Sequence, residues 1–237
     1  MEAVILAAGV GSRMAGSTGG MPKCMVRVGG RSILSRALAT LDGAGIRRVT
    51  IVTGYERDAL ERHAVIHAGR LAIEFVHNAE YQSTNNCVSL WMVRSRLTED
   101  FVLLESDLLF SAGTLASVMR PDAAAVCRLG PRMHGTVATV TDDGRVARFI
   151  LADEARPSGE LYKTVNLYAL RHRTWHDAVW PALDRMVRRN DVGNFYERAL
   201  ALAIDEGTLC LRASICEPEA WCEVDTPDDL KEAERRV

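Results

Sequence analysis

A glycine-rich turn near the start of the chain carries the first residues that could do chemistry. It consists of Gly9-Val10-Gly11, and Ser12 and Arg13 follow it directly. Glycines leave room for backbone N–H groups to approach a ligand closely. Together with Lys23, these residues add a hydroxyl and two cations to the turn. N–H donors with an arginine fork and a lysine charge suit a polyphosphate, so the turn is predicted to bind one.

Two other interpretations of this turn have to be weighed. Glycine-rich turns after a first strand are common without any role in ligand binding. The dinucleotide-binding pattern G-x-G-x-x-G requires a third glycine, and here that position is occupied by Met14. The sequence therefore argues against a dehydrogenase and favours a different phosphate-binding enzyme.

Asp107 and Asp225 are the candidate metal ligands. Asp107 follows the apolar run 101–105, and Asp225 follows a second apolar run, 220–224. Both runs are predicted strands, and ligands in such sheets bind beyond the carboxyl ends of the strands. Alone, the first aspartate could form a turn and the second could cap a helix. As a pair beside a phosphate-binding turn they favour Mg²⁺, which prefers a few carboxylates together with phosphate oxygens and waters.

Polar residues in the second half of the chain are candidates for a second ligand. Lys163 and Asn166 lie in a predicted strand, three positions apart. Because side chains alternate along a strand, only one of them is expected to face the site. Tyr196 and Glu197 offer an aromatic face and a carboxylate, which suit a small cation. The alternative is an amphipathic helix with an exposed glutamate.

Several motifs resemble a known superfamily along essentially the whole chain. Leu6-Ala-Ala-Gly-x-Gly-Ser-Arg13 with Pro22-Lys23 is similar to the signature of the sugar-phosphate nucleotidylyltransferases. Members of that superfamily join a nucleoside triphosphate to a phosphorylated small molecule and release pyrophosphate. Other stretches resemble the phosphocholine and 2-aminoethylphosphonate cytidylyltransferases within it: Ser83-Thr-Asn-Asn-Cys-Val-Ser-Leu90, Leu104-Glu-Ser-Asp107, Lys163-Thr-Val-Asn-Leu-Tyr168 and Trp221-Cys-Glu-Val-Asp225.

The resemblance implies roles for the binding residues. The matching aspartates bind the catalytic magnesium, and a matching lysine, here Lys163, is expected to bind the phosphate or phosphonate of an acceptor. Asn86 and Ser89 match positions that line the cytosine pocket, although one of the two asparagines, Asn85 or Asn86, is expected only to cap its helix. The nucleotide is therefore expected to contact Leu6, Ala7, Ala8, Gly9, Gly11, Ser12, Asn86 and Ser89, and the acceptor to contact Lys163, Asn166, Tyr196 and Glu197.

Lys23 and Arg13 are the expected catalytic residues. Catalysis of phosphoryl transfer consists mostly of positioning and neutralisation of charge. Lys23 would act on the α-phosphate of CTP, and Arg13 on the leaving β- and γ-phosphates. An anionic acceptor oxygen needs no general base.

The predicted reaction is transfer of CMP from CTP to a small phosphonate, such as 2-aminoethylphosphonate or 2-hydroxyethylphosphonate. One alternative is a phosphocholine cytidylyltransferase, and another is a sugar-1-phosphate or inositol-phosphate nucleotidylyltransferase. Cys24 follows Lys23 where sugar-specific members more often have proline or alanine, which argues against a hexose phosphate. A nucleotide-binding module without catalysis is disfavoured because Arg13, Lys23, Asp107 and Asp225 are all present.

Alternation of predicted strands and helices indicates how these residues are positioned. Apolar runs and helical periodicities alternate through residues 1–128, with short connections, which predicts a parallel sheet covered on both faces. Asp142-Asp143-Gly144 predicts a hairpin between 136–141 and 145–150. Pro181 is expected to kink a helix over 175–187. Residues 152–161 are expected to form a surface loop or lid.

The predicted fold is a Rossmann-like, three-layer α/β/α nucleotidyltransferase fold with a mixed, mostly parallel sheet and a small hairpin and helical subregion on the acceptor side. Residues 1–237 are predicted to form one domain, in which 1–130 mainly bind the nucleotide and 131–237 the acceptor. Strands are expected at 3–7, 48–53, 71–77, 101–105, 123–128, 163–170, 209–213 and 220–224, and helices at 33–44, 55–67, 85–97, 112–119, 194–204 and 226–236.

Bulk composition narrows the partners and the compartment. The 237 residues carry a formal net charge of −2, which argues against a nucleic-acid polymer as partner. No apolar run has transmembrane length, and no leader segment is evident, so no membrane association is expected. The six cysteines include no C-x-x-C pair, which favours reduced thiols in a cytoplasmic protein. The sequence also allows a homodimer.

Overall fold

A nine-stranded mixed sheet forms the centre of the computed structural model, which describes residues 1–14, 19–131 and 133–236. Neighbouring strands β6 (Phe101–Glu105), β1 (Glu2–Ala7), β4 (Arg48–Thr53) and β5 (Ala72–His77) run parallel in that order. Every residue of β1 is buried, as expected for a parallel strand covered on both faces.

Helices cover both faces of this sheet. Along β1, Val4 and Leu6 belong to one hydrophobic cluster, whereas Ala3 and Ile5 belong to another. The first cluster includes side chains of α4 (Asn86–Met92), and the second includes side chains of α2 (Ile33–Gly43), α3 (Arg57–Ile66) and α5 (Ala112–Val118). The alternation confirms the predicted three-layer α/β/α arrangement.

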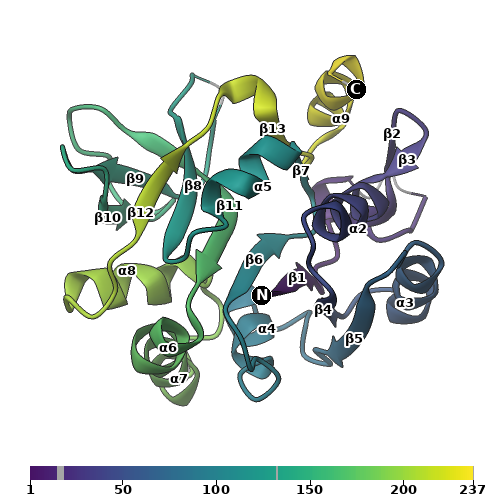
Figure 1. Cartoon of the computed structure of the whole chain (residues 1–237), viewed down its shortest axis with the longest axis horizontal. Helices are drawn as coiled ribbons and strands as arrows, with labels where there is room; N and C mark the ends of the chain where they lie inside the picture. The colour runs from purple at the N-terminus through teal and green to yellow at the C-terminus, as the bar shows by residue number, and fades with distance from the viewer. Residues whose placement is uncertain (15–18, 132, 237) are drawn as a thin grey trace.

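The second half of the chain extends the sheet through antiparallel pairing. Strand β11 (Tyr162–Leu170) pairs antiparallel with β6, with β8 (Ala123–Arg128) and with β9 (Val137–Val140). The predicted hairpin joins β9 to β10 (Val146–Ile150). Strand β12 (Arg212–Ile215), which begins three residues later than expected, runs parallel to β8. Figure 1 shows β6 and β11 at the junction between the N-terminal strands and β8 to β12.

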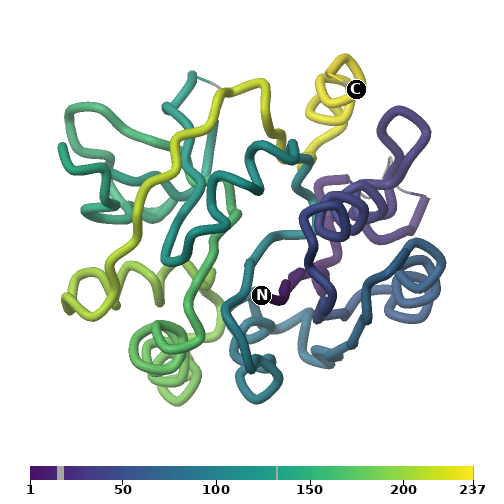
Figure 2. The backbone as a smooth tube through the Cα atoms, in the orientation of Figure 1, coloured from purple at the N-terminus to yellow at the C-terminus, as the bar shows by residue number. Residues whose placement is uncertain are grey.

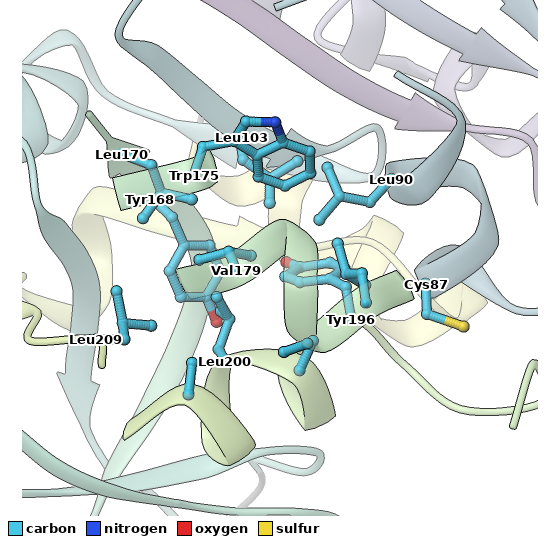
Figure 3. Packing of buried hydrophobic residues seen from close by; sticks show 14 of the residues in the cluster. Cys87, Leu90, Leu103, Tyr168, Leu170, Trp175, Val179, Tyr196, Leu200 and Leu209 are labelled. Atoms are coloured by element: carbon cyan, nitrogen blue, oxygen red, sulfur yellow. The ribbon is translucent and has the colours of Figure 1, made fainter. Parts of the chain in front are cut away.

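The helix predicted over 175–187 has a different internal structure. It consists of α6 (His172–Thr174), a π-helical turn at Trp175–Val179 and α7 (Trp180–Arg188). Pro181 lies in the first turn of α7, directly after the π-helical turn, and such turns interrupt the regular hydrogen-bond pattern of a helix. Figure 3 shows Trp175 beside Leu103 of β6, and Val179 near Tyr168 of β11 and Leu200 of α8 (Glu197–Asp205).

The C-terminal segment returns to the N-terminal part of the molecule (Figure 2). Strand β13 (Trp221–Glu223) pairs with β7 (Leu108–Phe110), outside the main sheet. Helix α9 (Pro227–Arg235) then lies beside β2 (Arg27–Val28), which forms a short ribbon with β3 (Arg31–Ser32). Thr226 and Asp229 form a capping box at the start of α9. Within the described ranges, no helix has the length and apolar character needed to cross a membrane.

Candidate active site

A cavity of about 1020 Å³ lies where residues that follow β1 and β6 meet β11 and β13. All predicted site residues except Tyr196 line it. They are Leu6, Ala7, Ala8, Gly9, Gly11, Ser12, Arg13, Lys23, Asn86, Ser89, Asp107, Lys163, Asn166, Glu197 and Asp225.

The glycine turn is shaped by close contact with Lys23. Gly11 has a φ of +65°, and a Cβ at this position would lie 2.9 Å from Cβ of Lys23. A larger residue would therefore be strained and would displace the lysine. At Gly9 a Cβ would meet nothing within 4 Å, so this part of the turn leaves space for a ligand. Residues 15–18, which follow the turn, lie outside the described residues.

Lys23 bridges the two predicted metal ligands. Its Nζ donates to Oδ2 of Asp107 at 2.5 Å and to Oδ1 of Asp225, and Arg13 Nη1 lies 3.5 Å from Oδ2 of Asp225. Burial alone would lower the pKa of Lys23, but the two carboxylates raise it above its ordinary value. Burial would likewise raise the pKa of Asp225, but Lys23 and Arg13 lower it. Lys23 and Asp225 are therefore both charged at neutral pH.

Pairing between β7 and β13 explains why these aspartates meet. Leu108 is opposite Glu223, and the N–H of Val224 donates to the carbonyl of Asp107 at 3.1 Å. The backbone thus places Asp107 and Asp225 side by side, although they are far apart in the sequence. Oδ1 of Asp107 is buried without a hydrogen-bond partner among the described residues, and it remains available to a ligand.

The segment predicted to recognise the cytosine base, residues 85–89, begins with a helix N-cap. Asn85 is the N-cap of α4 and accepts from the N–H of Asn86. The amide of Asn86 joins three elements, because its Nδ2 donates to Glu105 at 3.2 Å and its Oδ1 accepts from the N–H of Tyr196 at 2.9 Å. The hydroxyl of Ser89 accepts from Nδ2 of Asn78 at 3.1 Å. Asn78 is buried and was not predicted from the sequence as a site residue.

Backbone carbonyls at the end of β1 also have partners. The carbonyl of Leu6 accepts from the N–H of Ser106, and that of Ala8 accepts from the N–H of Tyr55. Gly54 allows the second contact, since a Cβ there would lie 2.5 Å from the oxygen of Ala8. The chain around β1 is thereby fixed before any nucleotide binds.

Lys163 and Asn166 face the same side of β11, so the prediction that only one would face the site is wrong. Lys163 Nζ donates to Oε1 of Glu223 at 3.1 Å, and Asn166 Nδ2 donates to the same oxygen at 2.6 Å. The pairing of β11 with β8 shifts register between Thr164 and Tyr168, and Asn166 has a φ of 59°. This irregularity breaks the alternation of side chains and turns Asn166 towards the cavity.

Tyr196 is not a ligand-facing residue, which corrects the prediction made for it. Its ring is buried in the core and packs edge-to-face on Tyr168, with centroids 5.8 Å apart (Figure 3). Its neighbours Phe195 and Glu197 line the cavity. Adjacent residues at the start of a helix point in different directions, so burial of the tyrosine ring leaves its neighbours to face the ligand.

Two further glutamates, which were not predicted, also line the cavity. Burial raises the pKa of Glu223 to about 7, although Lys163 opposes the shift. Burial, together with nearby carboxylates including Asp107, Glu197 and Glu223, raises the pKa of Glu105 well above its ordinary value. Both residues lie within motifs that carried the family resemblance, and their place in those motifs could have identified them as site residues.

The cavity lies beyond the carboxyl ends of β1 and β6, where open α/β sheets bind their ligands. A family model described as the MobA-like NTP transferase domain matches residues 3–199. The chain therefore belongs to the MobA-like NTP transferase family.

Relatives along the whole chain include a CMP-phosphonate synthase. The CMP-5'-(3-aminopropyl)phosphonate synthase of Streptomyces rubellomurinus is 33% identical over 100% of this chain, which spans only 38% of that protein. A UTP–glucose-1-phosphate uridylyltransferase of Haloferax volcanii is 28% identical over 100% of the chain and 96% of its own length. Among solved structures, the CTP:phosphocholine cytidylyltransferase of Streptococcus pneumoniae has a TM-score of 0.83 at 19% identity, with 99% of this chain and 97% of that chain covered.

Proposed function

We propose that this nucleotidyltransferase transfers CMP from CTP to a small phosphonate and releases pyrophosphate, with Mg²⁺ as cofactor. One observation carries the proposal: a single cavity holds the glycine turn with Lys23 and two aspartates, and also Lys163 with Asn166. The first group suits a triphosphate, and the second suits a smaller anion. The whole-chain similarity to a CMP-phosphonate synthase supports a phosphonate as that anion.

Residues of the chain position both reactants and neutralise their charge. An oxygen of the phosphonate attacks the α-phosphorus of CTP in line, forming a P–O bond while the bond to the β-phosphate oxygen breaks. Lys23 donates to the α-phosphate, and Arg13, whose side chain is 71% exposed, reaches the leaving pyrophosphate beside the glycine turn. Lys163 holds the attacking phosphonate. The attacking oxygen is already an anion, so the reaction needs no proton acceptor.

Asp107 and Asp225 fit a magnesium ion. They supply carboxylate oxygens, and Oδ1 of Asp107 has no other partner among the described residues. Those residues contain no group of three or more His, Cys, Asp or Glu side chains that could hold a metal ion. Magnesium commonly uses one or two carboxylates with substrate phosphates, so it would bind here together with CTP. Bound there, it would neutralise phosphate charge.

A sugar-phosphate acceptor is the second candidate, because the uridylyltransferase relative also matches the whole chain. The two candidates are separated by measuring pyrophosphate release from CTP, UTP, ATP and GTP. Each nucleotide is combined with 2-aminoethylphosphonate, 2-hydroxyethylphosphonate, phosphocholine, glucose 1-phosphate or inositol 1-phosphate. We expect CTP with the phosphonates to react fastest, and only in the presence of Mg²⁺. Preferred turnover of UTP with glucose 1-phosphate would instead establish the sugar-phosphate reaction.

A further inference from the structure

Carboxylates outnumber cations among the cavity residues on and around β11. Glu197 is buried, whereas Glu105 and Glu223 are half-buried. The cations there are Lys163 and Arg128, and Arg128 pairs with Glu160. The lysine donates to Glu223, and Asn166 donates to the same oxygen. Glu223 is therefore satisfied within the protein. The other two glutamates have no cationic partner among the described residues.

Glu197 is a buried carboxylate with an oxygen that lacks a hydrogen-bond partner within the described ranges. Glu197 is 4% exposed, and its Oε2 has no hydrogen-bond partner in the described part of the chain. Among the residues that the structure describes, the side chain of the neighbouring Glu105 accepts only from the neutral amide of Asn86, at 3.2 Å. A buried carboxylate without a partner is costly, and a cation bound beside it would offset that cost and favour the ionised form of the carboxyl. The pair therefore suits a cationic group on the acceptor.

The chemistry around these carboxylates distinguishes between kinds of cation. A primary ammonium has three N–H donors, which match unpaired carboxylate oxygens. A quaternary ammonium has no N–H donor and is recognised by a cage of aromatic faces. Phe195 lines the cavity next to Glu197, but the ring of Tyr196 is buried in the core, so the helix that carries Glu197 does not supply such a cage.

On the basis of the function proposed above, we propose that Glu197, supported by Glu105, binds the primary ammonium of an ω-aminoalkylphosphonate acceptor. Lys163 then holds the phosphonate end, and the two carboxylates hold the amine. Lys163 lies close enough to Glu197 to oppose the rise in the pKa of that carboxyl, which suits an acceptor with a short carbon chain. Glu197 is thereby a residue that selects amino over hydroxyl acceptors.

Replacement of Glu197 by glutamine removes the charge and keeps the shape. Steady-state rates are measured for wild type and Glu197→Gln with 2-aminoethylphosphonate, 3-aminopropylphosphonate, 2-hydroxyethylphosphonate and phosphocholine. We expect wild type to prefer the primary amines. In the variant, the ratio of kcat/KM between amino and hydroxyl acceptors should fall about 10- to 100-fold, the range for a charged hydrogen bond, while turnover of the hydroxyl compound persists. Glu206→Gln is the matched control, because Glu206 lies at the other end of α8 in an exposed pair with Arg185, and it should leave the ratio unchanged.

Other outcomes separate this inference from the proposed function. Wild-type preference for the hydroxyl compound, or an unchanged ratio in Glu197→Gln, would overturn the ammonium site and leave cytidylyl transfer intact. A raised Mg²⁺ requirement in Glu197→Gln, with unchanged selectivity, would identify a metal site there instead. If no phosphonate reacts with CTP, the proposed function fails.

Calorimetric binding of 3-aminopropylphosphonate and propylphosphonate to wild type and variant then tests the ammonium site directly. Equal affinities of the wild type for the two compounds would overturn that site.

Discussion

Replacement of Lys23 by alanine should affect both stability and catalysis, because one ammonium joins two carboxylates. The side chains of Lys23, Asp107 and Asp225 are 15%, 13% and 29% exposed. Breaking a fully buried ion pair costs about 3–5 kcal/mol. The exposure of Asp225 reduces this, so we expect a loss of about 2–3 kcal/mol. For a chain of this length, that loss lowers Tm by about 4–12 °C.

Magnesium should partly reverse the loss of stability in Lys23→Ala. Without the lysine, Asp107 and Asp225 are left facing each other, and Arg13 lies 3.5 Å from Asp225. A bound Mg²⁺ would replace the missing charge, whereas in wild type it must compete with Lys23. We therefore expect Mg²⁺ to raise Tm of the variant more than that of wild type. Differential scanning fluorimetry with and without Mg²⁺ measures this, and Ca²⁺ and Na⁺ serve as ionic controls.

The same variant tests the catalytic role of the lysine. Loss of one preorganised donor to the developing charge should lower kcat about 100- to 1,000-fold, with a smaller effect on the KM for CTP. The chain contains three lysines, and Lys231 is exposed and pairs with Asp228 on α9, so Lys231→Ala is the matched control and should change neither Tm nor kcat. Wild-type kcat in Lys23→Ala at saturating CTP would refute the catalytic role, and an unchanged Tm would refute the structural one.

Three further predictions follow from the geometry of single residues. Gly11→Ala should lower kcat/KM for CTP at least about tenfold in steady-state kinetics, because alanine would be strained at this positive φ and would displace Lys23. Unaltered kinetics would contradict this prediction. Tyr196→Phe should leave acceptor selectivity unchanged and Tm equal or higher, because the buried hydroxyl has no partner among the described residues; a changed selectivity would return Tyr196 to the acceptor site. Burial raises the pKa of Glu197 from 4.5 to about 7. Between these pH values the folded protein therefore binds more protons than the unfolded chain. The free energy of unfolding should fall by up to about 3 kcal/mol as the pH rises from 4.5 to 7. Denaturant titrations at several pH values should show a weaker fall in Glu197→Gln, and an equal fall would refute the assignment.

Local motifs allowed much of the site to be predicted from the sequence. The turn from Gly9 to Arg13 and the aspartate after β6 depend on residues that are close in the chain, so their spacing alone indicated a shared edge of the sheet. The same was true of the capping box at Thr226, which fixes the start of α9 directly after Asp225. These features depend little on distant parts of the molecule.

Features that depend on non-local pairing were not predictable in this way. Asn166 reaches the cavity because β11 shifts register against β8, and this shift is invisible in the alternation of one strand. Tyr196 turns away from the cavity, unlike Glu197, because its ring packs on Tyr168. The π-helical turn that precedes Pro181 was not predicted. Each of these outcomes depends on tertiary contacts that a single segment does not encode.

Identification of the reaction product tests the central proposal most directly. Wild-type enzyme is incubated with CTP, Mg²⁺ and 3-aminopropylphosphonate, and the products are examined by ³¹P NMR and mass spectrometry. Cytidylyl transfer predicts equal amounts of pyrophosphate and a CMP conjugate in which one oxygen joins the phosphonate phosphorus to the CMP phosphorus. No such conjugate from any of the phosphonates, together with formation of UDP-glucose from UTP and glucose 1-phosphate, would contradict the proposal.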